Sequence, residues 1–319
     1  MTVEAPDPRI TLVLRRRQAM PAELVSGVAR VTPAQLAERH GADPADVEQV
    51  TRAARAAGLT IAEVSPAARH VTVSGPAELL ETFTAEAISY AMGLDDVPRM
   101  RPQLQTIESR PRIVYTAPEV GAVYGFPGHL DGTGQTIAVI CVEGGYHPAD
   151  MALYFDDLGL SAPRIEDVGV EGVANTPGVA APQADREATL DLQIAGALAP
   201  GALLRAYFCR NNDRGILRAT AAAVHAAEPP TVVSISWGAP ELAFTTPFRR
   251  ALDEVFEDAA ALGVTVVAAT GDDGSGAGVG DGGSHVMYPS SHPLVLACGG
   301  TTLIADPATG VIHTETTWN

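Results

Sequence analysis

Two carboxylic acids spaced four residues apart are the first candidates for chemistry in this sequence. Glu187 and Asp191 lie in the segment REATLDLQIAGALAPG, whose apolar pattern predicts a helix over residues 186–198. A spacing of four places both side chains on one helix face, where they can share a proton. An isolated Glu-x-x-x-Asp is more often a solvated face. This helix, however, is otherwise largely apolar and is expected to be mostly buried, so the pair is a candidate general base with its partner.

A third acid follows an apolar segment that predicts a strand. The sequence AATGDDGS places Asp272 directly after a glycine, where the chain leaves the predicted sheet. A glycine-rich loop at such a point can also bind an anion through its backbone N–H groups, so a phosphate site is the rival interpretation. The similarity to the GDSGG of trypsin-like enzymes is set aside because Asp273 occupies the place of the serine. The glycines also lack G-x-G-x-x-G spacing, which makes a dinucleotide site a weak alternative.

The segment SISWGAPE is the third candidate, and it suggests peptide binding. Ser236, Trp237 and Gly238 end a predicted strand there. Such a strand can offer an open backbone edge to an extended peptide, with the indole ring as the wall of a pocket. The alternative is a core tryptophan beside a turn.

The elements that must position these residues form an alternating pattern from residue 135 onward. Apolar strands are predicted at TIAVICV, ALLRAYF, TVVSISW, VTVVAAT and LVLACGG. Helices are predicted between them, over residues 150–158, 186–198, 214–227 and 248–262. This order indicates a parallel sheet with helices on both faces. Ligands of such sheets bind beyond the carboxyl ends of the strands, where the SISWGAPE and AATGDDGS segments fall.

The first hundred residues follow a different pattern. Strands are predicted at residues 10–17, 60–64 and 70–73, and helices after the caps Thr32 and Asp43 and over residues 76–83. This order suggests a small antiparallel sheet with helices on one face. Residues 98–118, rich in proline and arginine, are expected to form an exposed linker.

Composition excludes several classes of function. The chain has 38 acidic and 21 basic residues and a net charge of −17, which argues against nucleic-acid and anionic-membrane partners. All the basic residues are arginine, so a P-loop lysine and a Schiff-base lysine are excluded. Cys141, Cys209 and Cys298 show no metal or redox spacing and are expected to be buried thiols. No apolar segment reaches membrane-spanning length, and the N-terminus does not resemble a signal peptide.

Taken together and in this order, the three segments resemble the sedolisin family, in its kumamolisin-like branch. LGVTVVAATGDDGS, SISWGAPE, LVLACGGT and the helix before GALAPGALLRAYF carry the resemblance, and YTAPEVGAVYGFP resembles the start of the mature enzyme. The resemblance implies an α/β, subtilisin-like, doubly wound parallel sheet, incomplete at its C-terminus, behind a small α+β propeptide. It places the propeptide at residues 1–110 and the peptidase domain at 111–319.

The resemblance also implies roles for the candidate residues. Glu187 would be the general base, Asp191 the carboxylate that orients it, and Asp272 the acid that completes the oxyanion hole. Ser236, Trp237 and Gly238 would belong to the substrate-binding strand.

Two departures from the family concern this site. Cys141 replaces an outer glutamate of the catalytic network, with Glu143 two residues on. Met287 replaces an aspartate at the base of the S1 pocket, which would make that pocket more apolar.

The family's nucleophilic serine, in a GGTSA-type motif, and its calcium ligands are expected beyond residue 319. The similar string GGTT at residues 299–302 corresponds to an earlier strand of the family. Our main hypothesis is therefore a serine-carboxyl endopeptidase zymogen acting on polypeptides at acidic pH, inactive as the chain stands. The resemblance also implies a calcium cofactor, a monomeric state and an extracellular location. The propeptide would act as an inhibitor and a folding aid, and it would be removed by cleavage near residues 109–115. The alternatives are a catalytically inactive truncated homologue that acts as a folding or binding module, and a nucleotide-binding protein.

Overall fold

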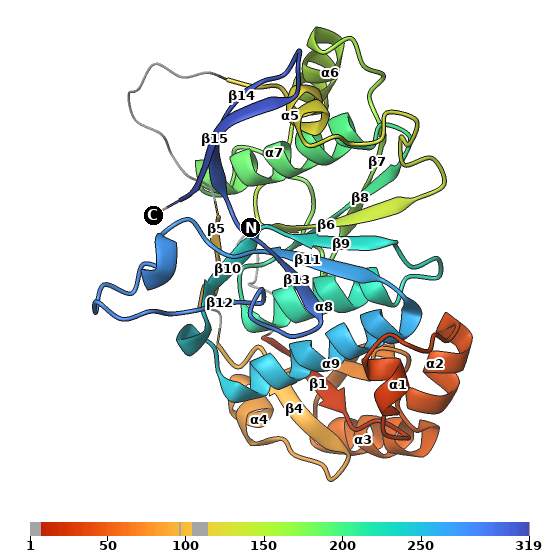
Figure 1. Cartoon of the computed structure of the whole chain (residues 1–319). Coiled ribbons are helices and arrows are strands. Elements are labelled where there is room, and N and C mark those ends of the chain that lie inside the picture. The colour runs from red at the N-terminus through yellow and green to blue at the C-terminus, as the bar shows by residue number, and fades with distance from the viewer. Residues whose placement is uncertain (1–7, 96, 104–113, 319) are drawn as a thin grey trace. The chain divides into compact units, whose positions relative to one another are not determined.

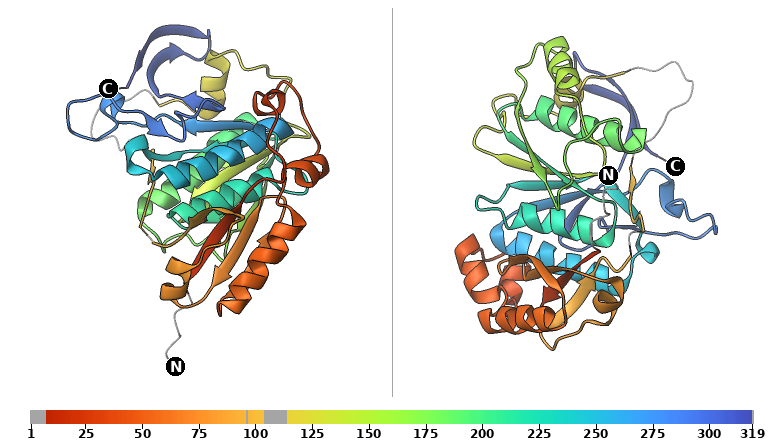
Figure 2. Two further views of the ribbon diagram at one scale, coloured as in Figure 1. Left: turned by 90° about the horizontal axis from the view of Figure 1, so that it is seen from below. Right: turned by 180° about the vertical axis from the view of Figure 1, so that it is seen from behind.

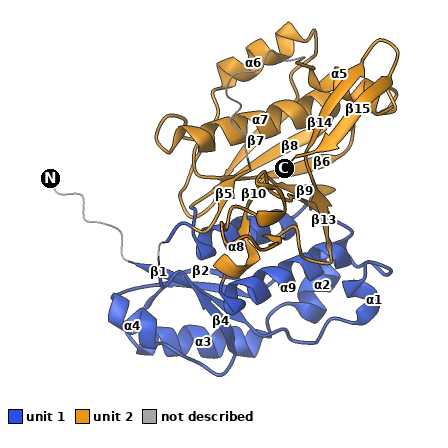
Figure 3. Cartoon of the chain, turned by 60° about the vertical axis from the view of Figure 1, so that its left-hand side comes forward, with its two compact units in different colours: residues 1–98, 211–229, 245–264 blue, residues 99–210, 230–244, 265–319 orange. Residues whose placement is uncertain are grey.

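The computed structural model describes residues 8–95, 97–103 and 114–318, and it divides into two compact units. Unit 1 comprises residues 1–98, 211–229 and 245–264, and unit 2 comprises residues 99–210, 230–244 and 265–319 (Figure 3). Two helices from the middle of the sequence therefore belong to the same unit as the N-terminal hundred residues.

Unit 1 contains a four-stranded antiparallel sheet in the order β2-β3-β1-β4. The strands are β1 (Arg9–Leu14), β2 (Thr60–Ser65), β3 (His70–Ser74) and β4 (Ile88–Met92). In β1, alternate side chains point to one face, where Ile10 and Leu12 lie opposite Val73 and Val71 of β3. These apolar side chains form a buried core with Val50, which lies on helix α3.

The helices of unit 1 are α1 (Ala22–Val25), α2 (Pro33–His40), α3 (Pro44–Ala56), α4 (Ala77–Thr82), α8 (Asp213–Val224) and α9 (Thr246–Leu262). Both predicted N-caps are confirmed. Thr32 and Gln35 form a capping box at the start of α2, and the Asp43 side chain accepts the backbone N–H of Ala45 at the start of α3. Proline follows each cap, where its missing N–H costs nothing.

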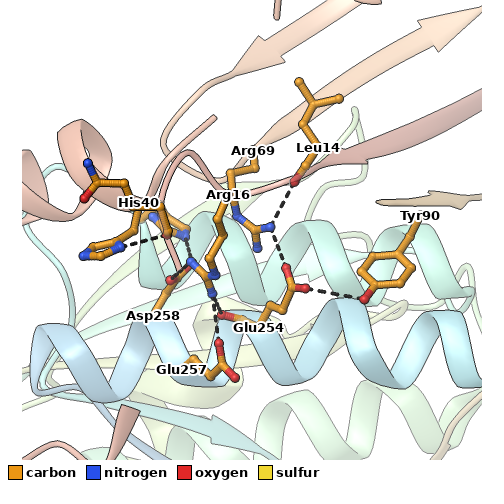
Figure 4. A network of polar contacts seen from close by, with 10 residues as sticks. Leu14, Arg16, His40, Arg69, Tyr90, Glu254, Glu257 and Asp258 are labelled. Atoms are coloured by element: carbon orange, nitrogen blue, oxygen red, sulfur yellow. Dashed lines mark hydrogen bonds and ion pairs between the residues drawn. The ribbon is translucent and has the colours of Figure 1, made fainter. Parts of the chain in front are cut away.

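The expectation of helices on one face of this sheet needs correction, because the second face is also covered. The second-face residues Thr11 and Thr72 are both buried, and their hydroxyl oxygens lie 3.1 Å apart. Tyr90 of β4 directs its hydroxyl to Glu254 of α9 at 3.5 Å. Polar side chains thus connect this face to α9 (Figure 4).

Unit 2 is built on a six-stranded parallel sheet in the order β13-β11-β9-β6-β8-β7 (Figure 1). The strands are β6 (Thr136–Val142), β7 (Arg164–Gly169), β8 (Leu203–Cys209), β9 (Val232–Ile235), β11 (Thr265–Ala269) and β13 (Val295–Cys298). Helix α7 (Pro182–Leu198) packs on β6 and β8 and shares a buried core with α6 (Pro148–Asp157). All five predicted apolar strands are confirmed, whereas the edge strand β7 was not predicted.

The strand order of this sheet reverses beside β6. After β6 the chain builds β7 and β8 on one side, and from β9 onward it builds on the other. Such a reversal opens a crevice at the carboxyl ends of the two central strands. The residues that follow β9 and β11 are therefore brought to this edge of the sheet.

Short strands and a hairpin complete unit 2. β5 (Arg101–Pro102), β10 (Trp237–Pro240) and β12 (Met287–Tyr288) form a small antiparallel sheet, with β10 in the middle. The hairpin of β14 (Thr301–Asp306) and β15 (Val311–Thr317) lies beside α5 (Ala117–Val123) (Figure 2). The Tyr124 hydroxyl donates a 2.6 Å hydrogen bond to Glu315 of the hairpin.

Two of these elements correct the prediction for the linker. Within the part of residues 98–118 that the structure describes, residues 101–102 form a strand and a helix begins at residue 117. The predicted cleavage region falls largely outside the described residues, since 104–113 are not described. Among the helices that are described, none has both the length and the apolar character needed to cross a bilayer.

Candidate active site

Helix α7 carries the two acids that the sequence singled out. Ala184, Ala188 and Leu192 bury one side of the helix against the sheet. Glu187 lies next to this apolar stripe and is only 2% exposed, and Asp191, one turn later, is partly buried. The helix therefore presents both carboxyl groups toward the interior, as its apolar surroundings predicted.

Burial makes both acids hold their protons more tightly. Loss of hydration raises the pKa of Glu187 to about 9, and the nearby charges of Asp191 and Asp272 act in the same direction. Burial also raises the pKa of Asp191 to about 7. Glu187 Oε2 is buried and has no hydrogen-bond partner among the described residues. Two neighbouring carboxyl groups with raised and unequal proton affinities can exchange a proton between them.

Ser236 joins this pair through its side chain. It lies between β9 and β10, and its hydroxyl donates a hydrogen bond to Asp191 Oδ1 at 2.7 Å. The hydroxyl lowers the pKa of Asp191 and of Glu187, against the larger effect of burial. The sequence assigned Ser236 to peptide binding, but the structure turns its side chain toward the carboxyl pair.

Asp272 follows β11 and lies within electrostatic reach of Glu187. Its Oδ2 atom is buried without a hydrogen-bond partner among the described residues. Burial raises the pKa of Asp272, the charge of Asp273 adds to the rise, and Arg101 opposes it. Gly271 before it has a φ of +96°, a conformation that favours glycine, and a Cβ there would lie 2.9 Å from Met287 Cγ. The turn therefore depends on glycine and leaves a buried carboxyl oxygen without a hydrogen-bond partner from the described residues.

An open pocket of about 420 Å³ adjoins this turn. The residues that line it include Thr270, Gly271, Met287, Ser290, Gly300 and Trp318. The predicted pocket residue Met287 thus lines a cavity next to Asp272. Trp237 is 4% exposed and is not among the residues that line this pocket, and its assignment to the substrate-binding strand stays a prediction.

The open edge of β10 is occupied by another part of the same chain. β5 pairs with it in antiparallel register, with Pro102 opposite Trp237 and Arg101 opposite Gly238. The backbone N–H of Gln103 donates to the Ser236 carbonyl at 3.0 Å, and its side-chain amide donates to the Gly238 carbonyl at 3.2 Å. β10 therefore accepts an extended segment by strand addition.

A second contact holds β5 in place, since Arg101 forms an ion pair with Asp273, next to Asp272. Sequence reasoning missed both Arg101 and Gln103. Their partners lie more than a hundred positions away, and nothing in the local sequence signals the pairing.

Cys141, the first departure from the family, and the nearby Glu143 have different surroundings. Cys141 lies in β6, is 1% exposed, and has a pKa raised by burial and by the charge of Asp191. The thiol is therefore neutral and adds no charge to the pair. Glu143, just beyond β6, has a φ of +61° and donates its backbone N–H to the Cys209 carbonyl at 2.8 Å.

Metal binding finds no support in the part of the chain that the structure describes. Its His, Cys, Asp and Glu side chains form no group of three that could hold a metal ion. These residues do not fit a calcium ion, and no step of the chemistry is assigned to one.

Known proteins resemble the chain over most of its length. Kumamolisin of Bacillus sp. (strain MN-32) is 38% identical over 358 aligned positions, which cover 97% of this chain and 64% of kumamolisin. Tripeptidyl-peptidase sed5 of Aspergillus fumigatus is 30% identical over 216 positions, covering 63% of this chain and 37% of that protein. No protein-family model matches the chain.

A solved structure agrees with these relatives. Pseudomonas sedolisin, a serine-carboxyl proteinase complexed with two molecules of pseudo-iodotyrostatin, superposes with a TM-score of 0.57 at 26% identity, over 64% of this chain and 58% of that one. The chain thus spans less than two thirds of kumamolisin and of the sedolisin structure. Unit 2 has an α/β, subtilisin-like fold. The chain belongs to the sedolisin family, in its kumamolisin-like branch.

Proposed function

We propose that the chain is part of a serine-carboxyl endopeptidase that cuts polypeptides at acidic pH. The observation that carries the proposal is the convergence of Glu187, Asp191 and Asp272 at one edge of the sheet, with a pKa raised by burial at each. Groups with strongly shifted pKa values gather at catalytic sites. The resemblance to kumamolisin supplies the class of reaction.

In this proposal Glu187 is the general base. It takes the proton of a serine hydroxyl as that oxygen attacks the carbonyl carbon of the scissile peptide bond, and it later returns the proton to the leaving amine. Asp191 orients Glu187 and exchanges a proton with it. Because burial raises the pKa of Asp272, its carboxyl group stays protonated further up the acidic range. A neutral carboxyl group can donate a hydrogen bond to the developing oxyanion.

This assignment predicts a bell-shaped dependence of activity on pH. At the alkaline limb, Asp272 loses the proton that it donates. At the acidic limb, the Glu187–Asp191 pair takes up a second proton and can no longer accept one from serine. Burial sets the pKa values of the pair at about 9 and about 7 in this chain, so activity in acid requires that these values fall when the serine and the substrate occupy the site.

The substrate would add a strand to β10, with Gly238 allowing close approach and Met287 giving the adjoining pocket an apolar wall. The geometry that supports this is the existing pairing of residues 101–103 with β10. We propose further that residues 1–110 form a propeptide, an intramolecular inhibitor and folding aid, because its linker occupies that edge. Cleavage near residues 109–115 would free it.

The remaining parts of the proposal rest on the resemblance to kumamolisin. The nucleophilic serine and the calcium ligands lie outside the 319 residues, and the enzyme works outside the cell as a monomer. The sequence supports the first point, since a GGTSA-type motif does not occur in it.

The test compares two forms of the protein on a denatured protein substrate between pH 3 and pH 7. The 319-residue chain should show no hydrolysis. The same chain extended by the segment of kumamolisin that it does not span should hydrolyse the substrate, and Glu187→Gln should abolish this. Asp157→Asn, at an exposed position at the end of α6, is the control and should keep it. A folded extended chain without activity, or one whose activity survives Glu187→Gln, would overturn the proposal.

A further inference from the structure

Ser236 makes two hydrogen bonds that point to different parts of the site. Its side-chain hydroxyl donates to Asp191 Oδ1 at 2.7 Å. Its backbone carbonyl accepts the N–H of Gln103, in the segment paired with β10, at 3.0 Å. One residue therefore contacts both the carboxyl pair and the strand that lies along the peptide-binding edge.

The hydroxyl of Ser236 is well placed to hold the carboxyl pair. It donates a hydrogen bond to the Asp191 side chain, whereas Oε2 of Glu187 has no partner among the described residues. A neutral hydroxyl that donates to a carboxyl group favours its ionised form. The Ser236 hydroxyl lowers the pKa of both acids, so removing it would leave the rise caused by burial without this offset.

The backbone of Ser236 depends on what occupies the edge of β10. Residues 234–235 belong to the parallel sheet, residue 237 starts the small sheet, and Ser236 lies at the junction. A paired strand fixes the dihedral angles of the residue whose carbonyl it binds, and these angles set the allowed side-chain rotamers. The pairing therefore restricts the directions in which the hydroxyl can point.

We propose that Ser236 is a positioning residue that couples occupation of the β10 edge by an extended peptide to the hydrogen bond that holds Asp191. The inference rests on the proposed function in one respect, that the pair is the acid–base pair of the reaction. By linkage, a strand that strengthens this bond eases ionisation of Asp191, and ionised Asp191 favours the bound strand to the same degree. Binding of an extended substrate would then prepare the pair to accept a proton.

The first arm of the test measures the titration of Asp191 in the 319-residue chain, by NMR of ¹³C-labelled carboxyl groups. Ser236→Ala should raise the midpoint of Asp191 by about 0.5–1 pH unit, a three- to tenfold change in proton affinity. Ser236→Thr, which keeps a hydroxyl, should restore it. The matched control is Ser291→Ala, which removes a hydroxyl that donates to Glu241 at 2.7 Å, and it should leave Asp191 unchanged. An unchanged midpoint in Ser236→Ala would overturn the inference.

The second arm tests the coupling itself. Gln103→Pro removes the N–H that binds the Ser236 carbonyl, whereas Gln103→Ala keeps it. Faster amide exchange in residues 236–239 reports loss of the pairing, and if protection persists, Arg101→Pro is added to Gln103→Pro. Once β5 is displaced, the Asp191 midpoint should rise, with Gln103→Ala close to wild type. A displaced strand with an unchanged Asp191 midpoint would overturn the coupling.

These measurements separate the inference from the proposed function. The titrations need no enzymatic activity, so they hold even if the extended chain proves inactive. Conversely, if the extended chain is active but the Asp191 midpoint is the same in Ser236→Ala as in the wild type, the proposed function stands and the inference is rejected.

Discussion

The guanidinium group of Arg16, which follows β1, lies 2.6 Å from Oδ1 of Asp258 in α9, although 242 positions separate the two residues. Both side chains are largely buried, at 10% and 2% exposure. Burial alone would raise the pKa of Asp258, but the hydrogen bond from His225 and the charge of Arg16 outweigh it and lower this pKa. The N-terminal sheet is thus joined to a much later helix by a buried ion pair (Figure 4).

Breaking this pair should strongly destabilise unit 1. Arg16→Ala leaves the Asp258 carboxylate buried without its main counter-charge, a change that typically costs about 3–5 kcal/mol. The measurement is the free energy of opening obtained from hydrogen exchange in β1 and α9. Arg52→Ala is the control, because Arg52 pairs with Glu48 at the exposed surface of α3 and should cost less than about 1 kcal/mol. Equal losses in the two variants would contradict the assigned role of the buried pair.

Acidification should also loosen unit 1 through His70. This residue of β3 is 2% exposed, and its Nδ1 atom has no partner among the described residues. Burial and the charges of Arg218 and Arg69 lower its pKa well below 6.5. The opened form therefore binds a proton below pH 6.5 that the closed form rejects. Stability is full above that pH and falls on acidification by up to about 1.4 kcal/mol per pH unit.

Hydrogen exchange in β3 between pH 7 and pH 4.5, corrected for the intrinsic rate, measures this loss. His70→Leu should remove this contribution to the slope. His129→Leu, at an exposed position in unit 2, should not. A wild-type protein whose β3 is equally protected at both pH values would show that His70 is not held neutral.

The sheet of unit 2 was largely predictable because its central strands are apolar along their whole length. β7 was missed because it lies at the edge, where RIEDVG has three charged residues and neither a continuous apolar run nor strict alternation. Its Glu166 pairs with Arg205 of the neighbouring strand. β5 and β12 have two residues each, and the distant pairing with β10 alone defines them. Local sequence carries no signal for such strands.

The acids of the candidate site could be predicted from the sequence, whereas the contacts that their side chains make could not. Glu187 and Asp191 follow from a spacing on a largely apolar helix, and Asp272 from its place after a strand. The direction of the Ser236 hydroxyl depends on Asp191, 45 positions earlier, so a strand pattern alone could not give it. Likewise, α8 and α9 belong to unit 1 through contacts with residues far away in the sequence, of which Arg16–Asp258 is one.

Gly238 should tolerate no side chain. A Cβ at this position would lie 2.9 Å from the backbone carbonyl oxygen of Tyr288 in β12, so a strand would have to move. Gly238→Ala is expected to destabilise unit 2 by about 1–3 kcal/mol. The control Gly128→Ala meets no atom within 4 Å and should change stability by less than about 0.5 kcal/mol. Denaturant unfolding followed by tryptophan fluorescence measures both, and a neutral Gly238→Ala would show that β10 and β12 are not tightly apposed.

The carboxyl pair should give unit 2 a pH dependence opposite to that of His70 in unit 1. Glu187 and Asp191 have pKa values raised by burial to about 9 and about 7. In the unfolded chain both groups ionise near pH 4, so the unfolded state binds fewer protons than the folded state above that pH. Stability is therefore highest below about pH 4 and falls as pH rises, until Asp191 and then Glu187 ionise in the folded protein. The slope is at most about 1.4 kcal/mol per pH unit for each group.

Denaturant unfolding from pH 4 to pH 9, followed by tryptophan fluorescence, reports unit 2 because Trp237 and Trp318 both lie in it. Glu187→Gln should remove at least half of the slope between pH 5 and pH 8, since its amide has no proton to lose. Asp157→Asn, at the exposed end of α6, should leave the slope as it is in the wild type. If unit 2 instead gained stability over this range, or if Glu187→Gln kept the full slope, the two carboxyl groups would not be the buried, proton-retaining pair on which the proposed chemistry depends.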